Sequence, residues 1–390
     1  MITFGTLALI SLAAVAGPLL AAPRAWRVPV VIGELSIGVA LGRTGVDTLH
    51  ASEPTFAFLA EVGFVLVMFV AGTHVPVRDP ALRSAVRAGT RQALLVAVLA
   101  GGAGAGLGAS FGTGHGALYG VLLACSSAAL VVPVVDEQGL AGPDVLRLLA
   151  QVAVADTACI VALPLAVEPS HALRAGGGAL AVIAAAGALF VLLREVEQRG
   201  WRHRLHHVSE KHRFALELRL SLAMVFALAY LATKTQVSVM LAGFSFGLAV
   251  AAVGEPRRLA KQLFAVTEGF FAPLFFVWLG ASLDLRDLVH HPRFLWLGML
   301  LGVGALVVHL ATRLMGQPSS LAVLSAAQLG VPVAATTIGT RLHVLRPGEG
   351  PALVLGALVT IAAATLSARV LGSTTGAPTD EGDSAVPADD

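Results

Sequence analysis

Charged side chains are scarce in this chain of 390 residues. Only 13% of its residues are Asp, Glu, Lys or Arg, whereas 56% are hydrophobic. Because about 25% of the residues in a soluble domain are charged, this composition excludes a soluble globular protein and predicts an all-α protein that crosses a membrane several times. The net charge of +2 decides little, since in a membrane protein the position of each charge matters more than the sum.

Cysteine is scarce as well, and a basic leader is missing. The two cysteines, Cys125 and Cys159, both fall inside long apolar runs. We expect them to pack as small side chains, and the pair says nothing about redox compartment. The N-terminus carries no basic segment before its apolar run, which is too long for a typical signal peptide. We therefore expect a first transmembrane helix that is retained.

Motifs for cofactors, metals or nucleic acids are missing or out of context. The segment GAGLGA (104–109) fits a loose dinucleotide-binding pattern, but it lies inside an apolar run instead of after a strand. His203 and His207 are four residues apart in a basic loop without matching carboxylate or Cys ligands. That loop (194–213) could sense pH instead. We expect no cofactor, no nucleic acid and no metal beyond a transported monovalent cation.

Long apolar runs are what the chain has in abundance. Bounded by charge, Pro or Gly, they predict about thirteen membrane-spanning helices at the usual length of about twenty residues. The predicted spans are 3–22, 28–46, 55–73, 92–111, 116–135, 145–167, 174–193, 214–233, 236–253, 263–282, 294–312, 319–340 and 350–371. The remaining residues, 372–390, are small, polar and acidic, so we expect a disordered tail and no soluble C-terminal domain.

The distribution of Lys and Arg predicts the orientation of these spans. With the N-terminus outside, the inner loops receive the arginines between 78 and 91 and the basic loop 194–213, together with most of the other basic residues. The outer loops receive fewer. Because basic residues are enriched on the cytoplasmic side, the sequence predicts an N-terminus outside and a C-terminus in the cytoplasm.

Two pairs of segments repeat along the chain. VPVVIGELSIGVALG (28–42) aligns with VSVMLAGFSFGLAVA (237–251), and FVAGTHVPVRD (69–79) aligns with VWLGASLDLRD (277–287) at nearly the same offset. Six spans, one linker span and six further spans would make the second half enter the membrane with the opposite orientation. This pattern predicts two inverted-topology six-helix repeats, an architecture of many secondary transporters. Chance similarity between apolar segments is the alternative.

A third pair contains proline. Val-Pro-Val occurs around Pro133 in the span 116–135 and around Pro332 in the span 319–340. Proline inside a span frees a carbonyl, and neighbouring Ser, Thr or Gly residues allow the backbone to unwind. Interrupted helices at corresponding positions of two halves point to a binding site at the membrane midplane. We therefore predict that both Val-Pro-Val segments unwind and cross; two kinked helices without exposed backbone are the alternative.

One carboxylate lies in the middle of a span. Asp156 is central in the run 145–167, where a charged aspartate costs at least about 3 kcal/mol, so an intramembrane ionisable residue is a functional-site hypothesis. We predict that it binds and releases a cation or a proton. The alternative is a protonated Asp that only packs.

Hard monovalent cations prefer oxygen ligands, and several are available near Asp156. The candidate ligands are Asp156, Thr157, Ser126, Ser127 and Gln328. For the hydroxyl groups, hydrogen bonding to their own helix is the alternative. Glu34 is deep in its span and is a possible second carboxylate, whereas Glu61 and Glu268 sit early in their spans and are expected at an interface. His309 lies near the end of its span and is expected to be a hydrogen-bonded packing residue.

These segments resemble the monovalent cation:proton antiporters, in the branch of bacterial sodium/proton and potassium-efflux exchangers. The resemblance covers about 1–371 and rests on VPVVIGELSIGVALG, FLAEVGFVLVMFVAG, CSSAALVVPV, VADTACIVALPLA and FFAPLFFVWLGASLDL. It implies a homodimer in a bacterial-type plasma membrane. Each protomer would have a dimerisation part (about 1–82 and 214–290), a linker helix (174–193) and a mobile core part (about 92–167 and 294–371) with two broken, crossing helices.

Residue by residue, the resemblance puts the essential aspartate of the family on Asp156 and the serines before it on Ser126 and Ser127. Two departures concern the ion and the stoichiometry. Many members have an acidic or amide residue where this chain has Ala155. Electrogenic members place Lys or Arg in the twelfth span, where this chain has Gln328 as the large polar residue. A nucleotide-binding domain, frequent in the family, is not expected here.

The sequence thus predicts a secondary antiporter, not an enzyme, which exchanges sodium or potassium for protons. With a single carboxylate at the site, one cation displaces one proton, so we expect electroneutral exchange. A non-transporting sensor on the same fold and a related ion-coupled solute transporter are the alternatives. An intramembrane hydrolase is disfavoured, because no second deep Asp and no Ser-Lys pair accompanies Asp156.

Overall fold

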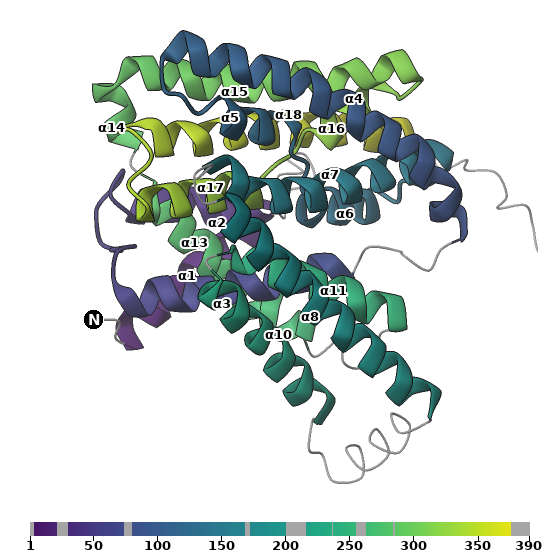
Figure 1. The fold of residues 1–390 in the computed structure, drawn as a ribbon. Coiled ribbons are helices and arrows are strands. Elements are labelled where there is room, and N and C mark those ends of the chain that lie inside the picture. The colour runs from purple at the N-terminus through teal and green to yellow at the C-terminus, as the bar shows by residue number, and fades with distance from the viewer. Residues whose placement is uncertain are drawn as a thin grey trace, which may run out of the picture.

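The computed structural model describes residues 4–21, 30–73, 80–167, 172–199, 216–235, 237–254, 263–283 and 285–375. Within these ranges the secondary structure is helical throughout, and the chain runs back and forth through one helical bundle (Figure 1). The predicted loop 194–213 and disordered tail 372–390 were wrong at their first residues, because α8 continues to Gln198 and α18 continues to Thr375. Residues 200–213 of the loop and 376–390 of the tail lie outside the described residues.

The first half of the chain ends in the helix that carries Asp156. Its helices are α1 (Phe4–Ala21), α2 (Val30–Leu41), α3 (Pro54–Thr73), α4 (Pro80–Phe111), α5 (Gly116–Ala124), α6 (Ala128–Glu137) and α7 (Pro143–Val167). A long helix, α8 (Ala172–Gln198), follows. It matches the predicted linker span 174–193 and extends beyond it at both ends.

The second half contains one π-helical turn and one 3₁₀ segment. Its elements are α10 (Leu216–Lys234), α11 (Val239–Val253), the π-turn η2 (Thr267–Phe271), α13 (Ala272–Ser282), α14 (Leu285–His290), α15 (Pro292–Leu310), η3 (Ala311–Met315), α16 (Ser319–Ser325), α17 (Gly330–Arg341) and α18 (Glu349–Thr375).

Eight helices of the described chain are long and apolar enough to cross a bilayer. Because lipid offers no hydrogen-bond partners, a helix that satisfies its own backbone is the structure expected of such runs. Each predicted span coincides with one helix or with one interrupted pair of helices. The largest boundary difference is at α4, which begins at Pro80, twelve residues before the predicted span; the polar residues of 80–91 continue the same helix.

The helices pack in two groups. In the first, α2 packs on α13, α3 packs on α11, and α1 and α8 flank these pairs. In the second, α4 packs on α5 and α7, and α15 packs on α18. Figure 1 shows α4, α15 and α18 at the top and α1, α3, α8 and α10 at the bottom, with α6, α7 and α17 between them.

Close glycine contacts join the helices of the first group. A Cβ atom on Gly38 would lie 2.9 Å from the Cα of Gly280, and a Cβ on Gly72 would lie 2.9 Å from the Cα of Gly247. Any side chain there would force the backbones apart. In the repeat alignment Gly38 corresponds to Gly247 and Gly72 to Gly280. Exchanging the two repeats therefore turns the Gly38–Gly280 contact into the Gly247–Gly72 contact. A two-fold relation between the repeats requires this equivalence.

Several loops meet at one end of the bundle. The Thr44 hydroxyl donates to the carbonyl of Leu283 (2.6 Å), Arg293 donates to the carbonyl of Ser110 (3.1 Å), and Arg346 donates to the carbonyl of Gly112. We call this end, with loops 42–53, 112–115 and 342–348, the Glu349 end. The sequence places all three of these loops on the outer side.

Candidate functional site

Both spans with a Val-Pro-Val segment are interrupted. The backbone between α5 and α6 is non-helical at 125–127, and the backbone between α16 and α17 is non-helical at 326–329. The interruptions that the sequence predicted for these spans are present. Each leaves two half-helices whose ends lie inside the bundle, where free backbone groups need partners.

The position of the interruptions was predicted wrongly. Pro133 lies within α6 and Pro332 in the first turn of α17, so both Val-Pro-Val segments are helical and the unwound residues precede them. Pro332 is compatible with its position because the first turn of a helix does not use that N–H group. The segments that unwind are those whose backbone finds partners across the crossing.

Hydrogen bonds connect the two interruptions directly. The N–H of Ser127 donates to the carbonyl of Ala327 (2.8 Å), and the Ser126 hydroxyl donates to the carbonyl of Ser325 (2.7 Å). These bonds satisfy polar groups that the unwinding has freed. The two interruptions therefore lie side by side and form one crossing in the centre of the second group of helices.

Asp156 lies at this crossing. Its side chain is 5% exposed, and its carboxylate accepts a hydrogen bond from the N–H of Ala128 (2.9 Å). Ala128 is the first residue of α6, so the carboxylate caps the N-terminus of a half-helix. The partial positive charge of that terminus stabilises a negative charge. The geometry gives Asp156 one protein hydrogen bond and leaves capacity for a further ligand on the same carboxylate.

The other predicted ligands differ in what they can offer. Thr157 donates its hydroxyl to the carbonyl of Ala153 (2.8 Å), as the alternative of bonding within its own helix anticipated. Gln328 is buried in the second interruption, and its side-chain oxygen has no partner among the described residues. Ser127 is buried beside Ala128 and uses its N–H group in the crossing.

Two polar residues at the crossing were not assigned to it from the sequence. Gln151 on α7 is fully buried, and its amide nitrogen lies 3.4 Å from the Ser325 hydroxyl. His309 is fully buried on α15, with Nδ1 2.8 Å from the carbonyl of Ala305 and Nε2 3.4 Å from the Ser126 hydroxyl. His309 is hydrogen-bonded, as predicted, but it contacts the crossing. The available signal was a polar residue within an apolar span in each case.

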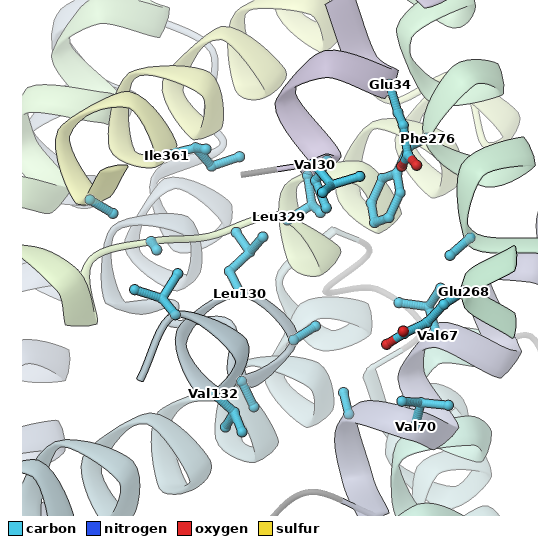
Figure 2. Close-up of a pocket in the computed structure, with 18 of the residues that line it drawn as sticks. Val30, Glu34, Val67, Val70, Leu130, Val132, Glu268, Phe276, Leu329 and Ile361 are labelled. Carbon is cyan, nitrogen blue, oxygen red and sulfur yellow. The ribbon is translucent and has the colours of Figure 1, made fainter. Parts of the chain in front are cut away.

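A cavity of about 320 Å³ separates the two groups of helices beside the crossing. Ala128, Ala327 and Leu329 line one wall, and Glu34 and Glu268 belong to the other (Figure 2). We call it the Glu34 cavity. Because Ala128 bonds to Asp156, the cavity reaches the immediate surroundings of the carboxylate. It lies away from the Glu349 end, since Val30 and Val31 at the start of α2 line it.

A second cavity of about 410 Å³ lies between the same two groups of helices, nearer the Glu349 end. It is lined by Glu61 and Phe64 from α3 and by Thr337 and Ile338 from α17. Phe64 stacks on Phe275 at a ring separation of 4.7 Å. Two cavities thus approach the crossing from opposite ends of the bundle.

Comparison with known proteins shows the family. The profile described as the transmembrane sodium/hydrogen exchanger matches residues 10–378. The chain belongs to the sodium/hydrogen exchanger family. That family consists of monovalent cation/proton antiporters and not of enzymes. The chain is an integral membrane protein with multiple spans.

Two curated relatives in the exchanger family are similar along most of this chain. YjbQ of Bacillus subtilis, whose name proposes a Na(+)/H(+) antiporter, is 23% identical over 356 residues, covering 85% of this chain and 57% of YjbQ. The glutathione-regulated potassium-efflux protein KefC of Escherichia coli is 26% identical over 286 residues, covering 72% of this chain and 45% of KefC. The chain therefore spans about half the length of these relatives.

The fold is that of a known exchanger. Two structures of the sodium proton antiporter MjNhaP1 from Methanocaldococcus jannaschii match with TM-scores of 0.63 and 0.68 at 16% identity. The matches cover 95% and 96% of this chain and 96% and 97% of MjNhaP1. At this identity the likeness shows the fold, and the roles of single residues have to be argued from this chain.

Proposed function

We propose that this exchanger transports sodium or potassium against protons by alternating access, with Asp156 as the group that carries both. The observation that carries the proposal is the position of the Asp156 carboxylate, buried at the crossing and 2.9 Å from the N–H of Ala128 at the start of α6. A buried carboxylate in this position is stable with either a proton or a dehydrated cation bound, and it cannot hold both at once.

Competition for one carboxylate is sufficient to couple the two fluxes. A monovalent cation that has lost water needs oxygen ligands, which Asp156, Ser126, Ser127, Thr157 and Gln328 would supply together with carbonyls of the crossing. The unpartnered oxygen of Gln328 supports its place in this set. Thr157 and Ser126 donate their hydroxyl hydrogens to the carbonyls of Ala153 and Ser325, so each would offer the cation the lone pairs of its oxygen.

Alternating access requires the site to open to each side in turn. The Glu34 cavity and the cavity around Glu61 lie between the same two groups of helices, on opposite sides of the crossing. We propose that the second group of helices is a mobile core (about 92–167 and 294–371) that moves against a dimerisation part (about 1–82 and 214–290), with 174–193 as the linker. Movement of this core would close one cavity and widen the other.

The same proposal includes the assembly and the orientation. The interchange of the Gly38 and Gly72 contacts supports two inverted six-helix repeats, a common basis of alternating access. We propose a homodimer in a bacterial-type plasma membrane with the N-terminus outside and the C-terminus in the cytoplasm. The loops that the sequence places outside lie together at the Glu349 end. This supports the assumption that successive spans cross the membrane in alternating directions.

The experiment that tests the function uses purified protein in proteoliposomes with an imposed pH gradient. Sodium, potassium and lithium are added one at a time, and only a cation that the protein transports should collapse the pH gradient. Asp156→Asn should abolish this collapse. Asp144→Asn is the matched control on the same helix, because Asp144 pairs with Arg147 near the surface. It should retain exchange.

Each alternative predicts a different result in that experiment. A membrane sensor would collapse the gradient with none of the three cations. An ion-coupled solute transporter would respond only when its solute is added. Exchange by Asp156→Asn at the rate of the unmodified protein would reject Asp156 as the carrier.

A further inference from the structure

The wall of the Glu34 cavity that faces the crossing differs from the wall opposite. The crossing side is apolar apart from Thr365, with Ala128 and Leu329 at its centre. The opposite side presents Glu34 from α2 and Thr267 and Glu268 from the π-turn η2. Figure 2 shows the carboxyl groups of Glu34 and Glu268 across the cavity from Leu130 and Val132. Among the described residues that line it, none is Lys, Arg or His.

Glu34 is a buried carboxyl group. Its side chain is only 4% exposed, and it has no hydrogen-bond or ionic partner among the described residues. A carboxyl group removed from water without a partner costs several kcal/mol, which the protein normally avoids by pairing it. Its neighbours instead hold it in place: Gly17 has no room for a side chain, since a Cβ there would lie 2.7 Å from the Cγ of Glu34.

Thr267 is unpartnered in the same wall. It is 1% exposed, and its hydroxyl has no hydrogen bond among the described residues. Thr365, which lines the same cavity, shows the ordinary behaviour: its hydroxyl donates to the carbonyl of Ile361 (2.8 Å). A buried hydroxyl without a partner requires an explanation. Thr267 begins a π-turn, and such turns often occur at functional sites.

We propose that Glu34 and Thr267 form a second binding site for the transported monovalent cation, where the ion waits before it reaches Asp156. A carboxylate and a hydroxyl oxygen are suitable ligands for a hard cation that keeps part of its water.

This inference depends on the proposed function, because the cation is the exchanged one, but it assigns a different task. A waiting site binds the ion without carrying it across the membrane. Its loss should therefore lower the local concentration of the cation beside Asp156, which raises the apparent KM and leaves the maximal rate at saturating cation intact. It should also act on one side only, since the Glu34 cavity lies away from the Glu349 end.

The first test is exchange in inside-out and right-side-out vesicles with Thr267→Val and Glu34→Gln. With cation supplied on the side of the Glu34 cavity, both variants should raise the apparent KM by about 3- to 10-fold, the loss expected for one polar ligand. The maximal rate at saturating cation should stay within about twofold. Thr360→Val, a buried hydroxyl that does not line the cavity, and Glu195→Gln on the surface of α8 are the controls and should leave KM unchanged.

The second test is binding of radioactive sodium to purified protein. Asp156→Asn should keep a weak cation site that the double variant Asp156→Asn/Glu34→Gln lacks. An unchanged KM in both Thr267→Val and Glu34→Gln would overturn the waiting site, and so would complete loss of exchange in Glu34→Gln at saturating cation. Full exchange by Asp156→Asn would instead reject the carrier, so the two proposals fail by different observations. A thermal melting curve for each variant excludes a folding defect.

Discussion

The two interruptions of the crossing have the same backbone design and different chemistry. In the first, the N-terminus of α6 receives the Asp156 carboxylate. In the second, the N-terminus of α17 receives no side-chain cap among the described residues. The interruption before it contains Gln328, whose side-chain oxygen has no partner among those residues. The two halves of the chain therefore repeat the backbone interruption, but they do not repeat the carboxylate beside it.

This difference teaches where the ion can bind. A half-helix N-terminus carries a partial positive charge, so by itself it repels a cation. At α6 the carboxylate reverses that sign, whereas at α17 nothing does. We infer that the first interruption determines binding and that the second supplies neutral oxygens and room. Variants that remove one feature at a time from matched positions can break or sharpen this comparison.

The largest effect is expected at Asp156. Asn keeps an oxygen that can accept from the N–H of Ala128, whereas Ala removes the cap, which costs about 1 kcal/mol of stability. Both Asp156→Asn and Asp156→Ala should lose exchange, but only Asp156→Ala should lower the melting temperature in detergent. Equal melting temperatures for the two variants would contradict the capping role.

A smaller effect is expected from serines at matched positions. The Ser126 hydroxyl bonds across the crossing to Ser325, whereas the Ser325 hydroxyl donates to the carbonyl of Ala322 within its own segment. Ser126→Ala should slow exchange by about fivefold, the equivalent of one hydrogen bond of about 1 kcal/mol. Ser325→Ala should change it by less than about twofold. Initial rates of pH-gradient collapse measure the effects of both variants. A larger loss of rate in Ser325→Ala than in Ser126→Ala would contradict our inference about the two interruptions.

A third comparison concerns buried amide oxygens without partners. Gln328 is in the second interruption, whereas Gln92 is on α4, and the side-chain oxygen of each lacks a partner among the described residues. If Gln328 is a cation ligand, Gln328→Leu should raise the apparent KM for the cation by about fivefold, as for one lost polar contact. Gln92→Leu should not. The KM is measured over a series of cation concentrations, and equal values for the two variants would remove Gln328 from the ligand set.

Most of the helical architecture could be predicted from the sequence, because a membrane leaves long apolar runs few alternatives to a helix. The interruptions could be predicted as well, but not their exact place. Proline at 133 and 332 was a visible signal, whereas the unwound residues 125–127 and 326–329 depend on hydrogen bonds between segments about 200 residues apart. Such partners leave no local pattern.

Site residues could be predicted where a polar side chain interrupts an apolar run. They were harder to predict where only the three-dimensional packing brings a residue to the site. Asp156 and Glu34 stand out as carboxylates within spans. His309 was expected near the end of its span, yet the neighbouring α5–α6 interruption brings Ser126 to within 3.4 Å of it. Thr267 is unremarkable in the sequence, since only the packing of the π-turn shows that its hydroxyl has no partner.

The smallest effect is expected from the membrane potential. Asp156 on α7 places a charge at the first interruption, and residues 326–329 of the second carry none. One cation should therefore displace one proton, and the cycle should move no net charge. A potential of 100 mV contributes about 2.3 kcal/mol per unit charge moved, so an electrogenic cycle would respond clearly. With the potential set by a potassium gradient and valinomycin, and sodium as the tested ion, the rate and the end-point should not change. A response would mean that a second buried group titrates during the cycle. Glu34→Gln and His309→Gln would then identify it, because the variant that lacks the group should be insensitive to the potential.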